Sequence, residues 1–463
     1  MASPLVSIII PAYNNAEYLP DAIQSVLDQT YPNLELIVVN DASPDNTSEV
    51  VKKYNDPRIR YVVHENNQGL SAARNTGILT AKGDIVALLD GDDFYHPDKF
   101  QEHVDFLEKN PDIGVTYNAR FELNHSAKTI RELWRPALTA RLMDLVMGFP
   151  FSPSDMVIRR EWALRVNMFE KKYVYVGEDL DFNCRLALAG CKFASVDRAL
   201  NYRRYHSGRM IKDIAYFVDC TFQALKTTFS DSRCPKEILA IQDKVFASHY
   251  ILWSIIAFTQ NDTELGQKYC LAAIRGEPSF LSGHPNQLLK TIISYSIVDE
   301  NQDHEDLLRR IISQLPPELS WIADQCDWAI SRGYLLRFAR AMMWDRDKDG
   351  QSHFEKAIAY KASIDRSFLH QLSAQLLSYK MEFGAQAAHG ILESLSPYLE
   401  KLGSQEDVKW LKSNYSVNEA FYHYNLKDYA AVPHPVFSAL RNDPSLLLNR
   451  GVIKILLDSV VRR

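Results

Sequence analysis

Three carboxylates stand within four residues at the end of a strongly apolar run. The run ends at Leu89, and Asp90-Gly-Asp-Asp93 follows it directly. Like charges this close repel one another, so the arrangement is costly unless a cation neutralises it. A hard divalent ion, Mg²⁺ or Mn²⁺, shared between carboxylates and the phosphates of a ligand would do so. The alternative is a solvated acidic turn in front of a helix, since Asp is a common turn residue.

The segments around this turn alternate between buried strands and helices. Apolar runs predict strands at Leu5–Ile10, Leu34–Asn40, Ile59–Val63 and Ile85–Leu89, and helical periodicity predicts helices at Tyr18–Asp28 and Ser71–Ala81. This alternation is typical of an α/β fold with a mainly parallel sheet. Ligands bind such sheets beyond the carboxyl ends of the strands. Both acidic turns, the one at Asp41 and the one at Asp90–Asp93, are expected at such ends.

Seven segments, in order, resemble glycosyltransferase family 2. They are Val6–Asn14, Val39–Ser43, Asn67–Asn75, Leu89–Asp93, Ser154–Glu161, Gly177–Phe182 and Tyr202–Ser207. The resemblance implies a GT-A, Rossmann-like catalytic domain over residues 1–215. It also implies an inverting transfer of a sugar from a nucleotide diphosphate to a hydroxyl. Uridine is the commonest base in the family, so the implied donor is a UDP-sugar.

The same resemblance assigns a nucleotide-binding role to several residues. Pro11 and Tyr13 would frame the base, with the tyrosine ring offering a stacking face. Asp41 would accept hydrogen bonds from the base or ribose. Arg74 would contact the nucleotide with its planar, always-charged guanidinium, although a surface ion pair is the alternative.

Metal and diphosphate contacts are implied around the acidic turn. Asp92 would be the direct ligand of Mn²⁺ or Mg²⁺, and Asp90 would reach the ribose or a metal-bound water. Asp93 would support these two. His206 would complete the metal site or touch the diphosphate, with Arg203 nearby, although a lone histidine is more often structural.

Asp179 is the expected general base, and in the family the corresponding carboxylate faces the metal-binding turn across the sugar. It would take the proton of the attacking hydroxyl, which displaces the nucleotide diphosphate in one step and inverts the anomeric centre. Glu178 and Asp181 are competing candidates. Asp181 could instead orient the helix that carries Arg185.

Beyond about residue 207 strand-like runs vanish and helical periodicity continues to the end. The expected second domain, residues 216–463, is all-helical. Alanines recur in it, and Ala420, Ala439 and Pro444 fall at positions 8, 27 and 32 of a tetratricopeptide-like unit. An ordinary helical bundle with accidental alanine spacing and a degenerate repeat array both remain open. The region is expected to serve acceptor recognition, a protein partner or self-association, or simply to stabilise the catalytic domain.

Composition narrows the classes of partner. The net charge of −6 gives no reason to expect nucleic-acid binding. Six cysteines without a CxxC pair indicate buried thiols in a reducing compartment. No apolar stretch approaches the ~20 residues that span a bilayer, and the start has no basic flank typical of a signal peptide. We therefore expect a cytoplasmic protein, soluble or peripheral at the membrane, with a carbohydrate-containing acceptor.

Two rival functions are a sugar nucleotidyltransferase and a catalytically weak scaffold protein. The first would require a glycine-rich, basic loop after the first strand, and Pro11-Ala-Tyr-Asn-Asn15 is neither. The second is disfavoured by the intact carboxylates at positions 41, 90, 92 and 179.

Overall fold

The structure is a computed structural model that describes residues 3–124, 129–205 and 213–462. It contains two compact units. The first comprises Met1–Tyr295 and Arg309–Trp321, and the second comprises Ser296–Leu308 and Ile322–Arg463.

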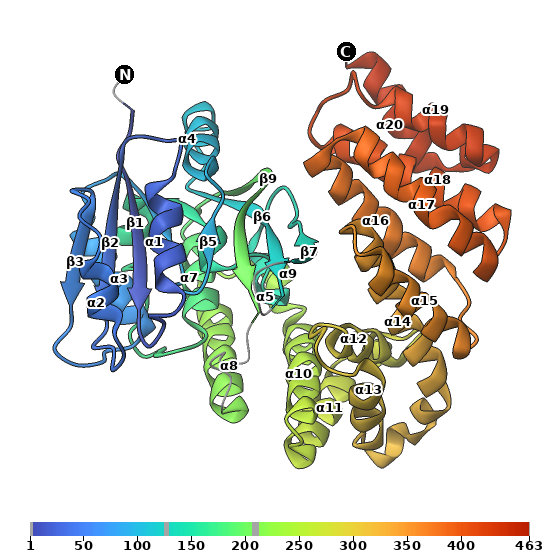
Figure 1. Ribbon diagram of the computed structural model, residues 1–463, viewed down its shortest axis with the longest axis horizontal. Coiled ribbons are helices and arrows are strands. Elements are labelled where there is room, and N and C mark those ends of the chain that lie inside the picture. Colours follow the sequence, from blue (N-terminus) through green and yellow to red (C-terminus); the bar gives the residue numbers. More distant parts are fainter. Residues whose placement is uncertain (1–2, 125–128, 206–212, 463) are drawn as a thin grey trace. The chain divides into compact units, whose positions relative to one another are not determined.

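A nine-stranded mixed sheet forms the centre of the first unit (Figure 1). Its strands are β1 (Val6–Ala12), β2 (Leu34–Asn40), β3 (Ile59–Val63), β4 (Ile85–Leu88), β5 (Phe94–Tyr95), β6 (Val115–Leu123), β7 (Ile130–Trp134), β8 (Val157–Arg159) and β9 (Phe193–Arg204). The strand order is β3-β2-β1-β4-β8-β6-β9-β5, and β7 pairs with β6.

The two halves of the sheet differ in strand direction. Strands β3, β2, β1 and β4 are all parallel, as the alternation of strands and helices predicts. Beyond β4 the sheet is mixed: β8 runs antiparallel to β4 and β6, and β6 is parallel to β9. Strand β5 is antiparallel to β9, and β7 is antiparallel to β6. The predicted parallel arrangement therefore describes only the first half.

Strand β1 explains why the first half is covered on both faces. All seven of its residues are buried. Because successive side chains point to opposite faces, Ile8 and Ile10 enter one hydrophobic core while Ile9 enters the other. Mostly apolar runs of this kind are typical of strands buried on both faces.

Helices pack on both faces of the sheet. From the N-terminus to α12 they are α1 (Leu19–Leu27), α2 (Thr47–Lys52), α3 (Leu70–Thr80), α4 (Lys99–Lys109), α5 (Leu142–Met147), the 3₁₀ turn η1 (Pro153–Asp155), α6 (Arg160–Arg165), α7 (Glu178–Leu188), α8 (Ile214–Ser230), α9 (Lys236–Leu239), α10 (Gln242–Thr259), α11 (Thr263–Gly276), the 3₁₀ turn η2 (Pro278–Leu281) and α12 (Gln287–Ser296). Helices α1 and α4 share the core that contains Ile8, and α3, α7 and α8 share the core that contains Ile9.

The first compact unit extends well past residue 215, where the family resemblance ends. Phe217, Trp253 and Tyr269, from α8, α10 and α11, belong to the same core as Ile9 and Tyr117 of the sheet. The first helices after residue 213 therefore stabilise the sheet. The boundary at 215/216 comes from the sequence motifs. It differs from the division between the compact units, which falls near residue 296.

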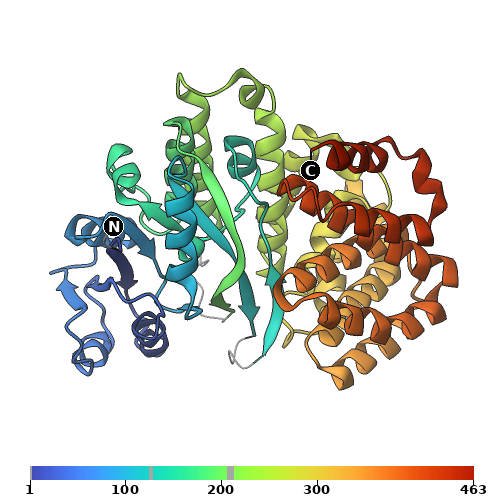
Figure 2. The ribbon, with the colours of Figure 1, turned by 90° about the horizontal axis from the view of Figure 1, so that it is seen from above.

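The remaining elements are helical. They are α13 (His304–Ser313), the 3₁₀ helix η3 (Pro317–Gln325), α14 (Cys326–Met343), α15 (Asp347–Ala359), α16 (Arg366–Phe383), α17 (Ala385–Leu402), α18 (Gln405–Asn425), α19 (Pro433–Asn442), the 3₁₀ turn η4 (Pro444–Leu448) and α20 (Arg450–Val461). Figure 2 shows the successive helices of the second unit packed one on another, in orange and red. The prediction of a helical C-terminal region is confirmed for the part of it that the structure describes.

The recurring alanines mark places where paired helices meet closely. Ala257 and Ala273, Ala341 and Ala357, and Ala420 and Ala439 are all fully buried. They lie in the contacting helix pairs α10–α11, α14–α15 and α18–α19. A small side chain at such a contact lets two helix backbones approach. A tetratricopeptide-like repeat remains a prediction. None of the helices among the described residues is long and apolar enough to cross a bilayer.

Candidate active site

The acidic turns lie where the sequence places them, at the carboxyl ends of two parallel strands. Asp41 directly follows β2, and Asp90–Asp93 connects β4 to β5. Strand β1 lies between β2 and β4 and ends at Ala12, whose carbonyl accepts the backbone N–H of Asp41 at 2.9 Å. The predicted nucleotide-binding residues Pro11, Tyr13 and Asp41 therefore belong to two adjacent strand ends.

Tyr13 and Pro11 are exposed to different extents. Pro11 is buried within β1, opposite Val39. Tyr13 lies just past the strand, and 46% of its surface is exposed. An exposed aromatic ring beside a strand end is suited to stacking against a planar base.

The carboxylate of Asp41 is held by the loop before α3. Its Oδ1 accepts the backbone N–H of Gln68 at 2.9 Å and lies 2.6 Å from Nδ1 of His64, and its Oδ2 accepts the N–H of Gly69 at 2.8 Å. Gly69 has φ of +89°, and a Cβ there would meet Val174 at 2.7 Å, so glycine is required. Asp41 thus fixes the start of α3, the helix that carries Arg74.

Arg74 joins the acidic turn to the start of α7. It is 1% exposed, and its Nη2 donates to Asp90 at 2.8 Å while its Nη1 donates to Glu178 at 2.7 Å. Burial alone would lower the pKa of Arg74, but these two carboxylates outweigh it and raise the pKa. Arg74 is therefore a permanent buried cation, not a surface ion pair, and it holds two acidic segments together.

Asp179 follows Glu178 in the first turn of α7. Gly177, which caps the helix, has φ of +82° in the left-handed region, so the chain turns sharply into α7 at this point. Burial, and next the charge of Glu178, raise the pKa of Asp179 to about 7, against the opposing effects of Arg74 and the Leu180 N–H. A carboxylate that titrates near neutral pH suits a general base.

The two competitors of Asp179 are already engaged by arginines. Glu178 is paired with Arg74, and Asp181 accepts Nε of Arg185 at 2.7 Å. Arg185 also donates to the backbone carbonyls of Val166 and Met168. The pair of Asp181 and Arg185 therefore anchors α7 to the preceding loop, as one reading of the sequence predicts.

A small pocket borders Asp179 in the first unit. Its walls are Leu145, Gly148, Phe149, Pro150, Phe151, Asp179, Leu180 and Asn183. The aromatic and aliphatic walls give one side of the carboxylate an apolar surrounding. Its volume of about 10 Å³ has room for little more than one water molecule.

Asp93 and the surroundings of Asp92 show how the acidic turn is held. Asp93 is buried; its Oδ2 accepts the hydroxyl of Ser154 at 3.0 Å, and its Oδ1 accepts the backbone N–H of Arg204 at 3.2 Å. Asp92 is half-buried. Gly91 lies so close to Asn15 that a Cβ at position 91 would approach its Nδ2 to 1.9 Å.

Arg203 lies among other charged residues of β6 and β7. Its Nη1 is 3.5 Å from Oε1 of Glu122, which also pairs with Arg120 and Arg131. Burial would raise the pKa of Glu122, but Arg203, Arg120 and Arg131 together lower it to about 2. The expected contact of Arg203 with a diphosphate remains a prediction. His206 lies outside the described residues.

The donor atoms of the site suit a divalent ion that arrives with a phosphate ligand. Within the described ranges, no three His, Cys, Asp or Glu side chains converge into a ready-made metal cluster. Magnesium-type sites often use one or two carboxylates and complete their shell with phosphate oxygens and water. Arg74 is the buried cation that pairs with Asp90 and Glu178. Asp179 is a third carboxyl group beside this single cation. Asp90 and Asp92 would therefore gain from an added cation.

Reasoning from the sequence missed Asn15 and the role of Ser154. Asn15 precedes α1 and carries no family-typical signal, yet it contacts the acidic turn. Ser154 lies in a segment that the resemblance places on the acceptor side, but its hydroxyl contacts Asp93. The family-like motif at Ser154–Glu161 indicated that this segment is functional. Only the three-dimensional structure shows that it contacts the acidic turn.

Comparison with known proteins covers the N-terminal part of the site, up to residue 166. The sequence model described as Glycosyl transferase family 2 matches residues 7–166. An uncharacterised glycosyltransferase of Bacillus subtilis, EpsJ, is 34% identical over 191 residues, which cover 39% of this chain and 55% of that protein. An uncharacterised glycosyltransferase of Rickettsia bellii is 31% identical over 281 residues, which cover 58% of this chain and 39% of that protein.

A solved structure is also similar in part. A crystal structure of residues 1–349 of TarS from S. aureus in complex with UDP aligns with a TM-score of 0.44 at 17% identity, covering 78% of this chain and 93% of that one. The chain spans about half of the length of the first curated relative, EpsJ. The matched residues 7–166 contain β1, both acidic turns and Arg74. Residues 7–166 of this chain are therefore similar to glycosyltransferase family 2, and a helical region follows the sheet that contains them.

Proposed function

We propose that this protein is an inverting, metal-dependent glycosyltransferase. It transfers a sugar from a nucleotide diphosphate donor to a hydroxyl of a saccharide, lipid-linked or protein-linked acceptor. Asp179 acts as the base, and Asp90 and Asp92 hold Mn²⁺ or Mg²⁺. A UDP-sugar is the donor to test first, because uridine is the base that the family resemblance implies.

The observation that carries this proposal is the position of Arg74. Its two ends bind Asp90 at 2.8 Å and Glu178 at 2.7 Å, so a residue of the acidic turn and a residue next to Asp179 belong to one buried charge network. A donor diphosphate at the acidic turn would therefore place its sugar near the start of α7. Metal-binding carboxylates and a base on opposite sides of a sugar are what a single displacement requires.

The environment of Asp179 supports its role as the base. With the pKa raised to about 7, the carboxylate is both ionised in a useful fraction of molecules and basic enough to take a proton. Glu178 and Asp181 are held by arginines and would serve to orient α7.

The leaving nucleotide diphosphate carries the charge that develops in the reaction. A divalent ion held by Asp90 and Asp92 would supply positive charge to stabilise this group. Arg74 orients the Asp90 carboxylate through a hydrogen bond of 2.8 Å. Asp179 removes one proton from the acceptor hydroxyl, the oxygen forms the new bond to the anomeric carbon, and the bond to the diphosphate breaks. With one displacement, the anomeric configuration inverts.

A thermal-shift screen of nucleoside diphosphates and nucleotide sugars, each with and without Mn²⁺, tests the proposal. A ligand at 100 times its dissociation constant stabilises the folded protein by about 2.7 kcal/mol. We expect a shift with a nucleoside diphosphate or its sugar that requires Mn²⁺. A shift with nucleoside triphosphates alone would favour a nucleotidyltransferase, and no shift with any nucleotide would favour a scaffold protein.

A further inference from the structure

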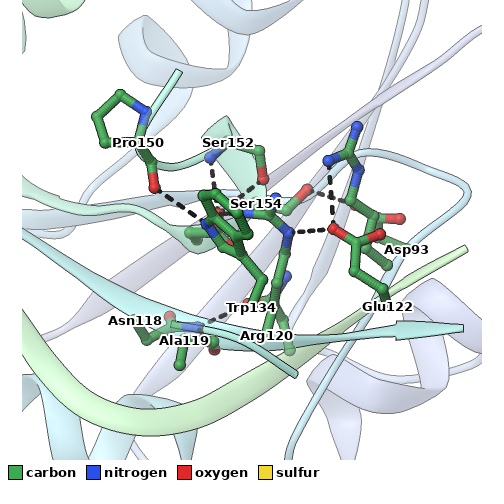
Figure 3. A network of polar contacts seen from close by, with 12 residues as sticks. Asp93, Asn118, Ala119, Arg120, Glu122, Trp134, Pro150, Ser152 and Ser154 are labelled. Carbon is green, nitrogen blue, oxygen red and sulfur yellow. Dashed lines mark hydrogen bonds and ion pairs between the residues drawn. The ribbon is translucent and has the colours of Figure 1, made fainter. Parts of the chain in front are cut away.

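The hydroxyl of Ser154 contacts two residues of the acidic turn at once. Its Oγ accepts the backbone N–H of Asp90 at 3.1 Å and donates to Oδ2 of Asp93 at 3.0 Å. Ser154 is fully buried, so water does not compete for these hydrogen bonds. Figure 3 shows Ser154 and Asp93 within one polar network. A single side chain, 61 to 64 positions further along the chain, thus fixes both the backbone and a carboxylate of the turn.

The turn that carries Ser154 is itself held by two buried basic side chains, Lys99 and Arg120. The Nζ of Lys99 donates to the carbonyls of Ser154 at 3.1 Å and Asp155 at 3.3 Å, and to Oδ1 of Asn118. These three acceptors match the three donors of an ammonium group. Nη1 of Arg120 donates to Oδ2 of Asp155 at 2.7 Å.

The rest of the network closes η1 into a rigid turn. The backbone N–H of Ser152 donates to the same Oδ2 of Asp155 at 2.7 Å. Trp134 lies over Arg120, with the guanidinium carbon 5.4 Å from the ring centroid, and its Nε1 donates to the carbonyl of Pro150 at 3.3 Å (Figure 3). The segment from Pro150 to Asp155 is therefore fixed at both ends.

Such a network is expensive to bury. A buried ammonium or guanidinium must recover its lost hydration from hydrogen bonds, and an apolar replacement of similar volume is often as stable. The burial of Lys99 and Arg120 beside Ser154 and Asp155 is therefore not explained by stability alone. It is explained if these side chains hold Ser154 in an accurate position.

We infer that Ser154 is a positioning residue for donor binding, with Lys99 and Arg120 holding it in place. Its hydroxyl sets the orientation of the Asp90 peptide and makes Asp93 a support for the turn, so that Asp90 and Asp92 present their carboxylates to the metal and diphosphate. This inference rests on the proposed function. The resemblance places the Ser154 segment on the acceptor side of the site, whereas its contacts with the acidic turn indicate a role on the donor side.

A matched pair of variants tests this inference. Ser7 is also fully buried; its Oγ donates to Glu35 at 2.7 Å and accepts the N–H of Gly83 at 2.9 Å. Ser154→Ala and Ser7→Ala therefore each remove one buried hydroxyl that bonds a carboxylate and a backbone N–H. Both should lower the melting temperature of the full chain by similar amounts.

The distinguishing measurement is the affinity for Mn²⁺·UDP by isothermal titration calorimetry. We expect Ser154→Ala to bind about tenfold more weakly than the wild type, the usual effect of losing a hydrogen bond to a charged group. Ser7→Ala should bind Mn²⁺·UDP within about twofold of the wild type, because the hydrogen bonds of Ser7 do not contact the ligand-binding turn. If Ser154→Ala is too unstable, Ser154→Cys can replace it, because the thiol is similar in size and forms weaker hydrogen bonds. This variant should also bind Mn²⁺·UDP more weakly than the wild type and Ser7→Ala.

Equal affinity of the wild type and the Ser154 variants would overturn the inference, and so would equal weakening in both alanine variants. Absence of Mn²⁺·UDP binding in the wild type itself is a separate result. It would refute the UDP donor of the proposed function, and with it this inference about the UDP site.

Discussion

Replacing Asp179 by asparagine should make the protein a poorer catalyst and, above neutral pH, a more stable one. The substitution keeps the size of the side chain and removes a charge that burial and Glu178 both disfavour. Loss of a positioned general base slows transfer by about 10²–10⁴-fold. Donor binding should remain, because the nucleotide contacts lie at the strand ends.

The gain in stability follows from the pKa. The pKa of Asp179 rises from 3.8 to about 7 on folding. Each unit is worth about 1.4 kcal/mol, which sets a ceiling of about 4 kcal/mol. The side chain is partly exposed, so solvent screening lowers the expected gain to about 1–2 kcal/mol.

The sign of the pH dependence is fixed by the direction of the shift. Because the folded pKa is the higher one, the folded wild-type protein holds a proton that the unfolded chain releases. Its stability therefore falls as the pH rises from about 4 to about 7, and is then level. The advantage of Asp179→Asn should grow from pH 5.5 to pH 8.

Differential scanning fluorimetry at the two pH values, together with a transfer assay, measures both effects. Asp181→Asn is the control, since Asp181 is paired with Arg185 and its loss should lower stability without abolishing transfer. An Asp179→Asn protein that is less stable than the wild type at pH 8, or that transfers sugar at the wild-type rate, would refute the reasoning.

Three further outcomes are expected. Arg74→Met should lower stability by about 3–5 kcal/mol in thermal unfolding, because it leaves the buried Glu178 without its partner; Arg60→Met, at a more exposed ion pair, should cost less than about 1 kcal/mol, and equal losses would contradict this. NMR of the product should show the anomeric configuration opposite to that of the donor, and retention would exclude the single displacement. A chain truncated after residue 212 should aggregate, because it loses the helices that complete the core of the sheet, whereas one truncated after Trp321 should still bind nucleotide in calorimetry; a well-folded shorter protein would contradict the shared core.

The parts of the fold that depend on local patterns could be predicted from the sequence. The runs of β1 and β2 are mostly apolar, interrupted only by Ser7 and Glu35 before their last residues, so they could be predicted as buried strands. The acidic turns follow from where these runs end. The mixed second half was less accessible. There β6 pairs with β8, β7 and β9, and no local pattern specifies such partners.

The contacts that organise the site could not be predicted either, because they join residues far apart in the chain. Arg74 and Glu178 are separated by 104 positions, and Asp90 and Ser154 by 64. The helices α8, α10 and α11 have apolar faces that show that something is packed there, but not that it is the sheet. Sequence reasoning therefore named the charged groups and left their pairing open.

Metal-dependent release of the nucleotide from a nucleotide sugar tests the central claim most directly. Wild-type protein, Asp92→Asn and a wild-type sample in excess EDTA would be incubated with a panel of UDP-sugars, with and without Mn²⁺, and the UDP released would be measured. We expect release by the wild type with Mn²⁺, and loss of that release in Asp92→Asn and in EDTA while the melting temperature of the variant is unchanged. Full release in EDTA, or an Asp92→Asn protein as active as the wild type, would contradict a metal-held donor at this turn.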